Sequence, residues 1–131
     1  MNPLQVSELQ HEILRILWDL EEARVTDVHA ALSESRELAS TTVSTLLARM
    51  EKKGLVRHRV DGRVFLYRAA VSEEEVRKSL VSDLTERVFQ GDLEALVSHL
   101  LGSEQVDREE LDRMRWLIER KQRELEATDG E

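Results

Sequence analysis

One dipeptide, Asp61-Gly62, limits the folds open to this chain more than any other feature. It separates two short runs of β-like composition, 55–60 and 63–69. Asp-Gly is a strong signal for a two-residue hairpin turn, because both residues tolerate a positive φ. In the register centred on this dipeptide, Arg59 pairs with Val64. The other apolar segments have helical spacing, so we predict one β-hairpin in a mainly α chain.

Three short helices are predicted before the hairpin. The first begins at Ser7, where Ser7-Glu8-Leu9-Gln10 has the pattern of a capping box. The second follows a predicted N-cap at Thr26, and the third ends at Gly54 after two lysines, as a helix C-terminus favours. The predicted inward face of the third helix consists of Val43, Leu46, Leu47 and Met50.

Three further helices are predicted in residues 71–131, beginning at Ser72, Asp92 and Asp107. A segment of this size cannot bury three apolar faces by itself, so we expect residues 71–131 to form a helical dimerisation domain. The alternative is that these helices pack against the domain formed by residues 1–70. The predicted dimerisation residues are Leu80, Leu84, Val88, Phe89, Leu93, Leu96, Val97, Leu100, Leu111, Met114, Leu117 and Ile118.

The net charge of −8 is distributed unevenly along the chain. Residues 40–70 carry seven basic residues and two acidic ones. Residues 1–39 carry three basic and eight acidic residues, and residues 71–131 carry nine basic and seventeen acidic residues. The basic middle and the acidic C-terminal half indicate surfaces that face different partners.

The order of three helices and a hairpin is typical of a winged helix-turn-helix domain. In that fold the third helix enters the major groove of DNA and the hairpin, or wing, lies along the phosphates. Small hydroxyl residues let a helix approach base edges, and the localised basic charge would bind phosphates. The predicted DNA-binding residues are Thr41, Thr42, Ser44, Thr45, Arg49, Lys52, Lys53, Arg57, Arg59 and Arg63. The alternative is a winged-helix protein-interaction module that does not bind DNA, which the acidic segments favour.

Little in the sequence supports catalysis or a cofactor. The chain has no cysteine, which excludes disulfides and thiolate metal sites. Glu8, His11 and Glu12 share a helix face, but the second histidine of a zinc-protease motif is missing, so a solvated face is expected. The N-terminus, MNPLQVSELQHE, lacks the features of a signal peptide, and no apolar run is long enough for membrane insertion. We therefore expect a cytoplasmic protein that is not an enzyme.

The segment Thr41–Val56, TTVSTLLARMEKKGLV, resembles the recognition helix of the BlaI/MecI/CopY (penicillinase repressor) family. Segments 9–18, 61–67 and 87–91 are also similar, so the resemblance covers about residues 5–120. It implies a homodimeric repressor of β-lactamase, resistance or copper-handling genes, bound to double-stranded operators with TACA/TGTA-like half-sites. A membrane sensor protease acting on the C-terminal domain is the further partner that the resemblance implies.

The sequence departs from the family pattern at three places. Penicillinase repressors carry basic side chains where this chain has Thr41 and Ser44, which leaves the detailed operator sequence open. The Asn-Phe bond that is cleaved in those repressors corresponds here to His99-Leu100. The cysteines of the copper-responsive members are missing, so copper sensing through thiolates is excluded.

Overall fold

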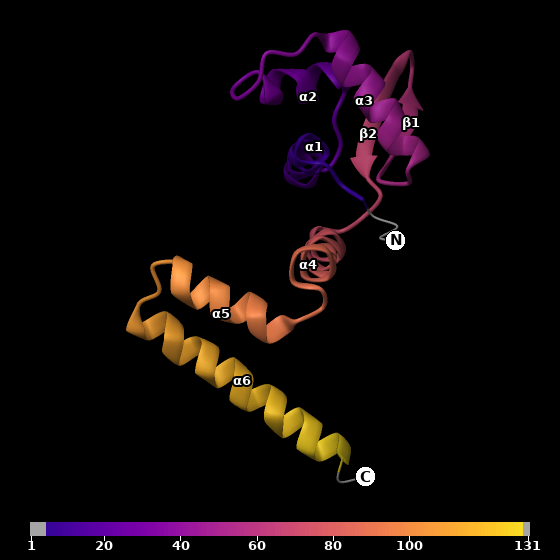
Figure 1. Cartoon of the computed structure of the whole chain (residues 1–131). Coiled ribbons are helices and arrows are strands. Elements are labelled where there is room, and N and C mark those ends of the chain that lie inside the picture. The colour runs from indigo at the N-terminus through magenta and orange to yellow at the C-terminus, as the bar shows by residue number, and fades with distance from the viewer. Residues whose placement is uncertain (1–4, 130–131) are drawn as a thin grey trace. The chain divides into compact units, whose positions relative to one another are not determined.

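The computed structural model describes residues 5–129, which form two compact units. The first unit ends at Val88 and the second begins at Phe89. Figure 1 shows that all the described elements except one hairpin are helices, as the sequence predicts. The elements are α1 (Glu8–Leu20), α2 (Val25–Leu32), α3 (Ser40–Lys52), β1 (Val56–Asp61), β2 (Val64–Ala69), α4 (Glu73–Phe89), α5 (Leu93–Ser103) and α6 (Arg108–Asp129).

Local capping interactions begin most of these helices. The capping box at α1 is confirmed, because the Ser7 hydroxyl accepts from the Gln10 N–H and the Gln10 side chain accepts from the Ser7 N–H, both at 3.1 Å. The predicted cap at Thr26 is wrong. The Asp27 carboxylate instead accepts from the backbone N–H of Arg24 at 3.0 Å, so α2 begins one residue before Thr26.

A Schellman motif ends α3 at the predicted glycine. Gly54 has a φ of +81°, and its N–H donates to the carbonyl of Glu51 at 3.0 Å. The N–H of Leu55 donates to the carbonyl of Met50 at 2.9 Å. These two bonds satisfy carbonyls that the helix itself leaves unpaired, and the left-handed position requires glycine.

The hairpin forms, but its predicted register is wrong. Asp61 pairs with Val64 and Arg59 with Leu66, so the two turn residues are Gly62 and Arg63. Gly62 has a φ of +67° and Arg63 does not have a positive φ, as in a turn that requires glycine only at its first central position. A turn centred on Asp61-Gly62 would have required a positive φ at Asp61 as well. Because the shift is two residues, the same side chains share a face in both registers.

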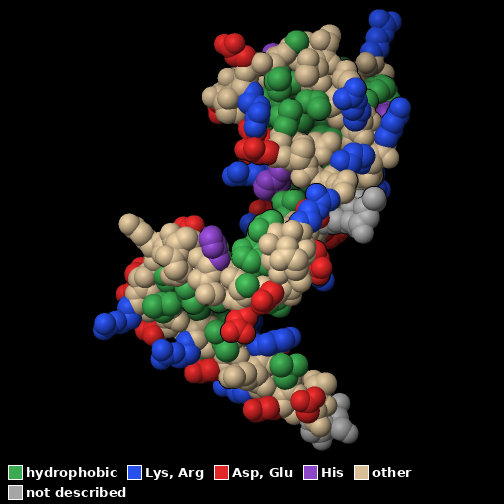
Figure 2. Space-filling view, viewed as in Figure 1, with side chains coloured by type: hydrophobic (Ala, Val, Ile, Leu, Met, Phe, Trp, Pro, Cys, Tyr) green, Lys and Arg blue, Asp and Glu red, His purple; other side chains and the backbone are tan. Residues whose placement is uncertain are grey.

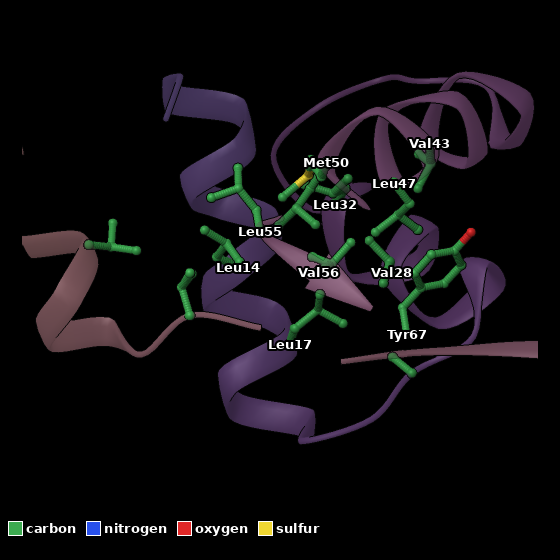
Figure 3. Close-up of a cluster of buried hydrophobic side chains, with 14 residues drawn as sticks. Leu14, Leu17, Val28, Leu32, Val43, Leu47, Met50, Leu55, Val56 and Tyr67 are labelled. Atoms are coloured by element: carbon green, nitrogen blue, oxygen red, sulfur yellow. The ribbon is translucent and has the colours of Figure 1, made fainter. Parts of the chain in front are cut away.

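One hydrophobic core lies inside the first unit. Figure 3 shows apolar side chains of α1, α2 and α3 pointing toward those of the hairpin. Tyr67 joins the hairpin to the loop after α1, since its N–H and carbonyl pair with Ala23 at 2.7 and 2.9 Å. The largest fully buried side chains are Ile13, Leu14, Leu17, Val28, Leu32, Val43, Leu47, Met50, Leu55, Val56 and Val76.

The boundary between the two units differs from the predicted one at residue 70. Val71 and Val76 belong to the core of the first unit, and Leu80 packs against that core. The indole N–H of Trp18 also donates to the carbonyl of Val71 at 2.9 Å. The first part of α4 therefore completes the N-terminal unit, because it covers apolar side chains that the three helices and the hairpin leave open.

The second unit consists of α5 and α6, and neither helix has a buried residue. Asp92 and Asp107 cap them as predicted, with carboxylates that accept from the N–H groups of Ala95 and Glu110 at 3.0 and 2.8 Å. Hydrophobic side chains of this unit reach its surface (Figure 2). Within the described residues no helix is both long and apolar enough to cross a membrane.

Candidate nucleic-acid interface

Three buried side chains determine which face of α3 meets solvent. Val43, Leu47 and Met50 are fully buried in the core, as predicted. The opposite face is therefore exposed, and the predicted contact residues lie on it. These exposed residues are Thr41, Thr42, Ser44, Thr45, Ala48 and Arg49.

Leu46 packs against the core, as predicted, but it is not fully buried. Its side chain is only half-buried, and it lines a shallow hollow of about 310 Å³ on the exposed side of α3. The other residues that line this hollow are Thr41, Thr42, Thr45 and Arg49. The sequence did not show that Leu46 is also partly exposed, because its position in the helical repeat lies at the border of the apolar face. The hollow combines methyl groups, hydroxyls and one guanidinium, which suit contacts to base edges.

The basic residues of the predicted interface divide into paired and unpaired groups. Arg59 donates two hydrogen bonds of 2.8 Å to the carboxylate of Glu22. Lys53 donates to the carbonyl of Gln5 at 2.6 Å and to the side chain of Gln10 at 3.2 Å. The remaining four form no ion pair with any described residue, and all four are exposed. These are Arg49, Lys52, Arg57 and Arg63.

The Arg59–Glu22 ion pair joins the hairpin to the loop after α1. The hydrogen bonds from Arg59 hold the pKa of the Glu22 carboxyl below its ordinary value, while Glu22 raises the pKa of Arg59. Both groups therefore stay charged across the neutral range. In the free protein Arg59 is tied to Glu22 from within β1, where it pairs with Leu66, whereas Arg63 occupies the turn at the tip of the wing. Figure 2 shows Lys and Arg side chains along the edge of the unit where α3 and the hairpin lie.

The connection before α3 is held by side chains of α1 and α2. Arg36 donates to the Glu12 carboxylate at 2.6 Å, and this hydrogen bond lowers the pKa of Glu12. The ring Nε2 of His29 contacts the carbonyl of Leu38 at 2.7 Å. Glu12 is thus committed to an ion pair. The described residues contain no group of three His, Asp or Glu side chains arranged to bind a metal ion.

The predicted dimerisation residues occupy different environments. Leu80 packs against the core of the first unit, and Phe89 and Leu96 are half-buried. The others are exposed: Leu84, Val88, Leu93, Val97, Leu100, Leu111, Met114, Leu117 and Ile118. In the second unit an apolar hollow of about 530 Å³ lies between α5 and α6, and Leu100, Met114 and Ile118 are among its lining residues. His99 and Leu100 are both exposed on α5.

Two known proteins are similar to this chain over most of its length. The penicillinase repressor of Bacillus licheniformis is 27% identical over 115 residues, which cover 88% of this chain and 90% of that protein. The methicillin resistance regulatory protein MecI of Mammaliicoccus sciuri is 22% identical over 117 residues, covering 89% of this chain and 95% of that protein.

A solved structure and a family model agree with these relatives. The solution structure of the DNA binding domain of the repressor BlaI is 29% identical, with a TM-score of 0.50, and covers 57% of this chain and 90% of that domain. The model of the penicillinase repressor family matches residues 6–120. The match includes α1 to α5 and the first half of α6, and so extends well beyond the winged-helix unit. The chain therefore belongs to the penicillinase repressor family, whose members include BlaI and MecI.

Proposed function

We propose that this protein is a homodimeric transcriptional repressor that binds a palindromic operator with TACA/TGTA-like half-sites. In each protomer α3 lies in the major groove and the β1–β2 wing follows the phosphate backbone. The observation that carries the proposal is the exposed face of α3, where small hydroxyl side chains lie beside Arg49. Lys52 is exposed on the same helix, and the hairpin carries the other two unpaired cations, Arg57 and Arg63. Relatives named as repressors, and a similar domain named as DNA binding, support it.

The test is a salt titration of binding to two duplexes, a palindrome of TACA/TGTA half-sites and a scrambled sequence of equal length. If each of the four unpaired cations contacts one phosphate in both protomers, the logarithm of affinity should fall with the logarithm of salt with a slope of about −7. The palindrome should bind at least about a hundredfold more tightly than the scrambled duplex. Weak binding that does not depend on salt would favour a protein-interaction module instead.

Thr45 is expected to contribute sequence recognition. Its hydroxyl donates to the Thr41 carbonyl at 3.0 Å, so its oxygen can still accept a bond, and the exposed side chain lines the hollow on α3. Thr45→Ala should weaken binding to the palindrome by roughly fivefold, the worth of about 1 kcal/mol, and leave binding to the scrambled duplex unchanged. Thr45→Val keeps the methyl group and replaces the hydroxyl by a second methyl. Comparison with Thr45→Ala therefore separates the contribution of the methyl group from that of the hydroxyl. Equal losses on both duplexes would mean that Thr45 contacts the phosphate backbone of DNA or contributes only to the folding of α3.

Arg63 is expected to contribute affinity without specificity. It lies in the exposed turn of the wing and has no partner among the described residues. Arg63→Ala should weaken binding to both duplexes alike and reduce the salt slope by about one unit for each protomer. Arg77→Ala on α4 removes the same charge from a residue that pairs with Glu73, and it serves as the matched control. An unchanged slope for Arg63→Ala would mean that the wing does not touch the phosphates.

We further propose that a membrane sensor protease releases the repressor by cleaving the His99-Leu100 bond. Cleavage there would divide α5, which contributes Val97, Leu100 and Leu101 to the apolar hollow of the second unit. The bond lies inside a helix, and the Leu100 carbonyl accepts from the N–H of Glu104 at 3.1 Å, so α5 must unwind locally before it is cut. Mass spectrometry of the protein from derepressed cells tests this. A fragment ending at His99 supports cleavage, and an intact chain contradicts it.

A further inference from the structure

His58 and Glu51 form a pair between the wing and α3 that the predicted interface does not include. The ring Nδ1 of His58 lies 2.6 and 2.9 Å from the two carboxylate oxygens of Glu51. Phe65 stacks on the imidazole, with ring centroids 4.1 Å apart and planes at 15°. Because an ionised carboxylate only accepts hydrogen bonds, Nδ1 carries a proton. The other nitrogen, Nε2, has no hydrogen-bond partner among residues 5–129.

The position of this pair makes its charge important. Glu51 lies on α3 between Arg49 and Lys52, and it is one of only two acidic residues in the basic segment 40–70. Its side chain is 34% exposed and that of His58 is 26% exposed. With a neutral imidazole the pair carries a charge of −1, which would repel the phosphates of a duplex bound at this surface. With an imidazolium the pair is neutral, and Nε2–H becomes a second donor.

We propose that His58 is a further DNA-contacting residue, and that operator binding takes up one proton at its Nε2. The Nε2–H then donates to a backbone phosphate, while Nδ1–H stays on Glu51 and orients the ring. The proton comes from solvent and no group on the protein releases one. This inference rests on the proposed DNA-binding function and adds to it a dependence on pH. Affinity should increase as pH falls through the range in which histidine gains its charge.

The other charged and titratable groups near His58 do not account for such a dependence. Tyr67 of β2 lies with its ring centroid 5.5 Å from that of His58. Burial, and to a smaller extent the charge of Glu51, raises the pKa of Tyr67, so its phenol stays neutral. Arg57, Arg59 and Arg68 alternate onto the other face of the hairpin and stay charged. From α3, the facing group is Glu51 itself.

The experiment is calorimetry of the full chain binding the palindromic duplex at pH 7.5, in two buffers that differ in ionisation enthalpy. The difference in observed heat gives the number of protons taken up. We expect between about 0.5 and 1 proton for each protomer, and a loss of affinity of up to about tenfold per protomer for each pH unit above pH 7. His58→Gln keeps a donor to Glu51 but cannot become charged, so its proton uptake should be close to zero. His11→Gln on α1 is the matched control and should behave like the wild type.

The possible outcomes separate this inference from the proposed function. Binding of the palindrome by the wild type with no proton uptake would overturn the role of His58 and leave the repressor proposal intact. Uptake that persists in His58→Gln would assign the proton to another group and also overturn it. If His58→Gln does not fold, the alternative experiment is an NMR titration of the His58 ring in the free and DNA-bound wild-type protein. A neutral His58 ring in the complex at pH 7.5 would contradict the inference. Failure of the wild type to bind any duplex at pH 6 would instead refute the repressor function.

Discussion

Replacing Ile118 by glutamate is expected to separate the proposed dimer into monomers and to lower operator affinity by about 10²–10⁴-fold. The Ile118 side chain is 58% exposed in the single chain and lines the apolar hollow between α5 and α6. If a second copy covers this hollow, a carboxylate placed there loses its hydration without gaining a partner. The loss of affinity follows because the tether to the second half-site is removed. Sedimentation and operator binding of the full chain measure both effects.

The neighbouring residue provides the control for this prediction. Glu119→Gln changes the charge by one unit at an exposed position outside the lining of the hollow, and it should leave the protein dimeric. Thermal unfolding of the first unit should be similar in both variants, because none of its core residues is altered. A wild-type chain that sediments as a monomer at micromolar concentration, or an Ile118→Glu chain that stays dimeric, would contradict the proposed role of this surface.

Leu47→Ala should lower the free energy of unfolding by about 2–5 kcal/mol, the range for removing a buried leucine side chain. Leu47 is 0% exposed and belongs to the core cluster that also contains Val28 and Tyr67. The cavity would lie in the core that packs against the buried face of α3, so this substitution tests how much that packing stabilises the first unit. Denaturant unfolding monitored by circular dichroism measures the loss.

An exposed residue of the same helix separates this effect from a general sensitivity of α3. Lys52→Gln removes the charge of an exposed side chain that lies outside the core, so its unfolding free energy should stay within about 0.5 kcal/mol of the wild type. Operator affinity should fall more in Lys52→Gln than in Leu47→Ala when both variants are measured under conditions in which they are folded. A loss below 1 kcal/mol for Leu47→Ala would mean that the core does not pack as described.

Features that depend on neighbouring residues could be predicted from the sequence. The capping box at Ser7, the left-handed glycine at Gly54 and the caps at Asp92 and Asp107 each involve groups no more than a few residues apart. The exposed face of α3 was also predictable, because apolar residues at helical spacing identify the opposite, buried face. The DNA-binding residues predicted on α3 are exposed for this reason.

The register of the hairpin was not predictable in the same way. Asp61-Gly62 and Gly62-Arg63 can each form a two-residue turn, and the two registers leave every side chain on the same face. In the folded chain Tyr67 pairs with Ala23 and is buried in the core, so contacts outside the hairpin accompany the observed register. Local turn propensity alone does not distinguish these two alternatives.

The sequence by itself determined the order of the elements, the ends of most helices and the buried face of α3, because these follow from periodicity and from contacts within a few residues. Only the tertiary structure decided that Val71 and Val76 complete the first core, that Arg59 pairs with Glu22, and that His58 lies against Glu51. The partners in each ion pair lie on different elements, and charged side chains carry no periodic signal that identifies a distant partner. Packing brings those elements together, and the pairing of charges follows from it.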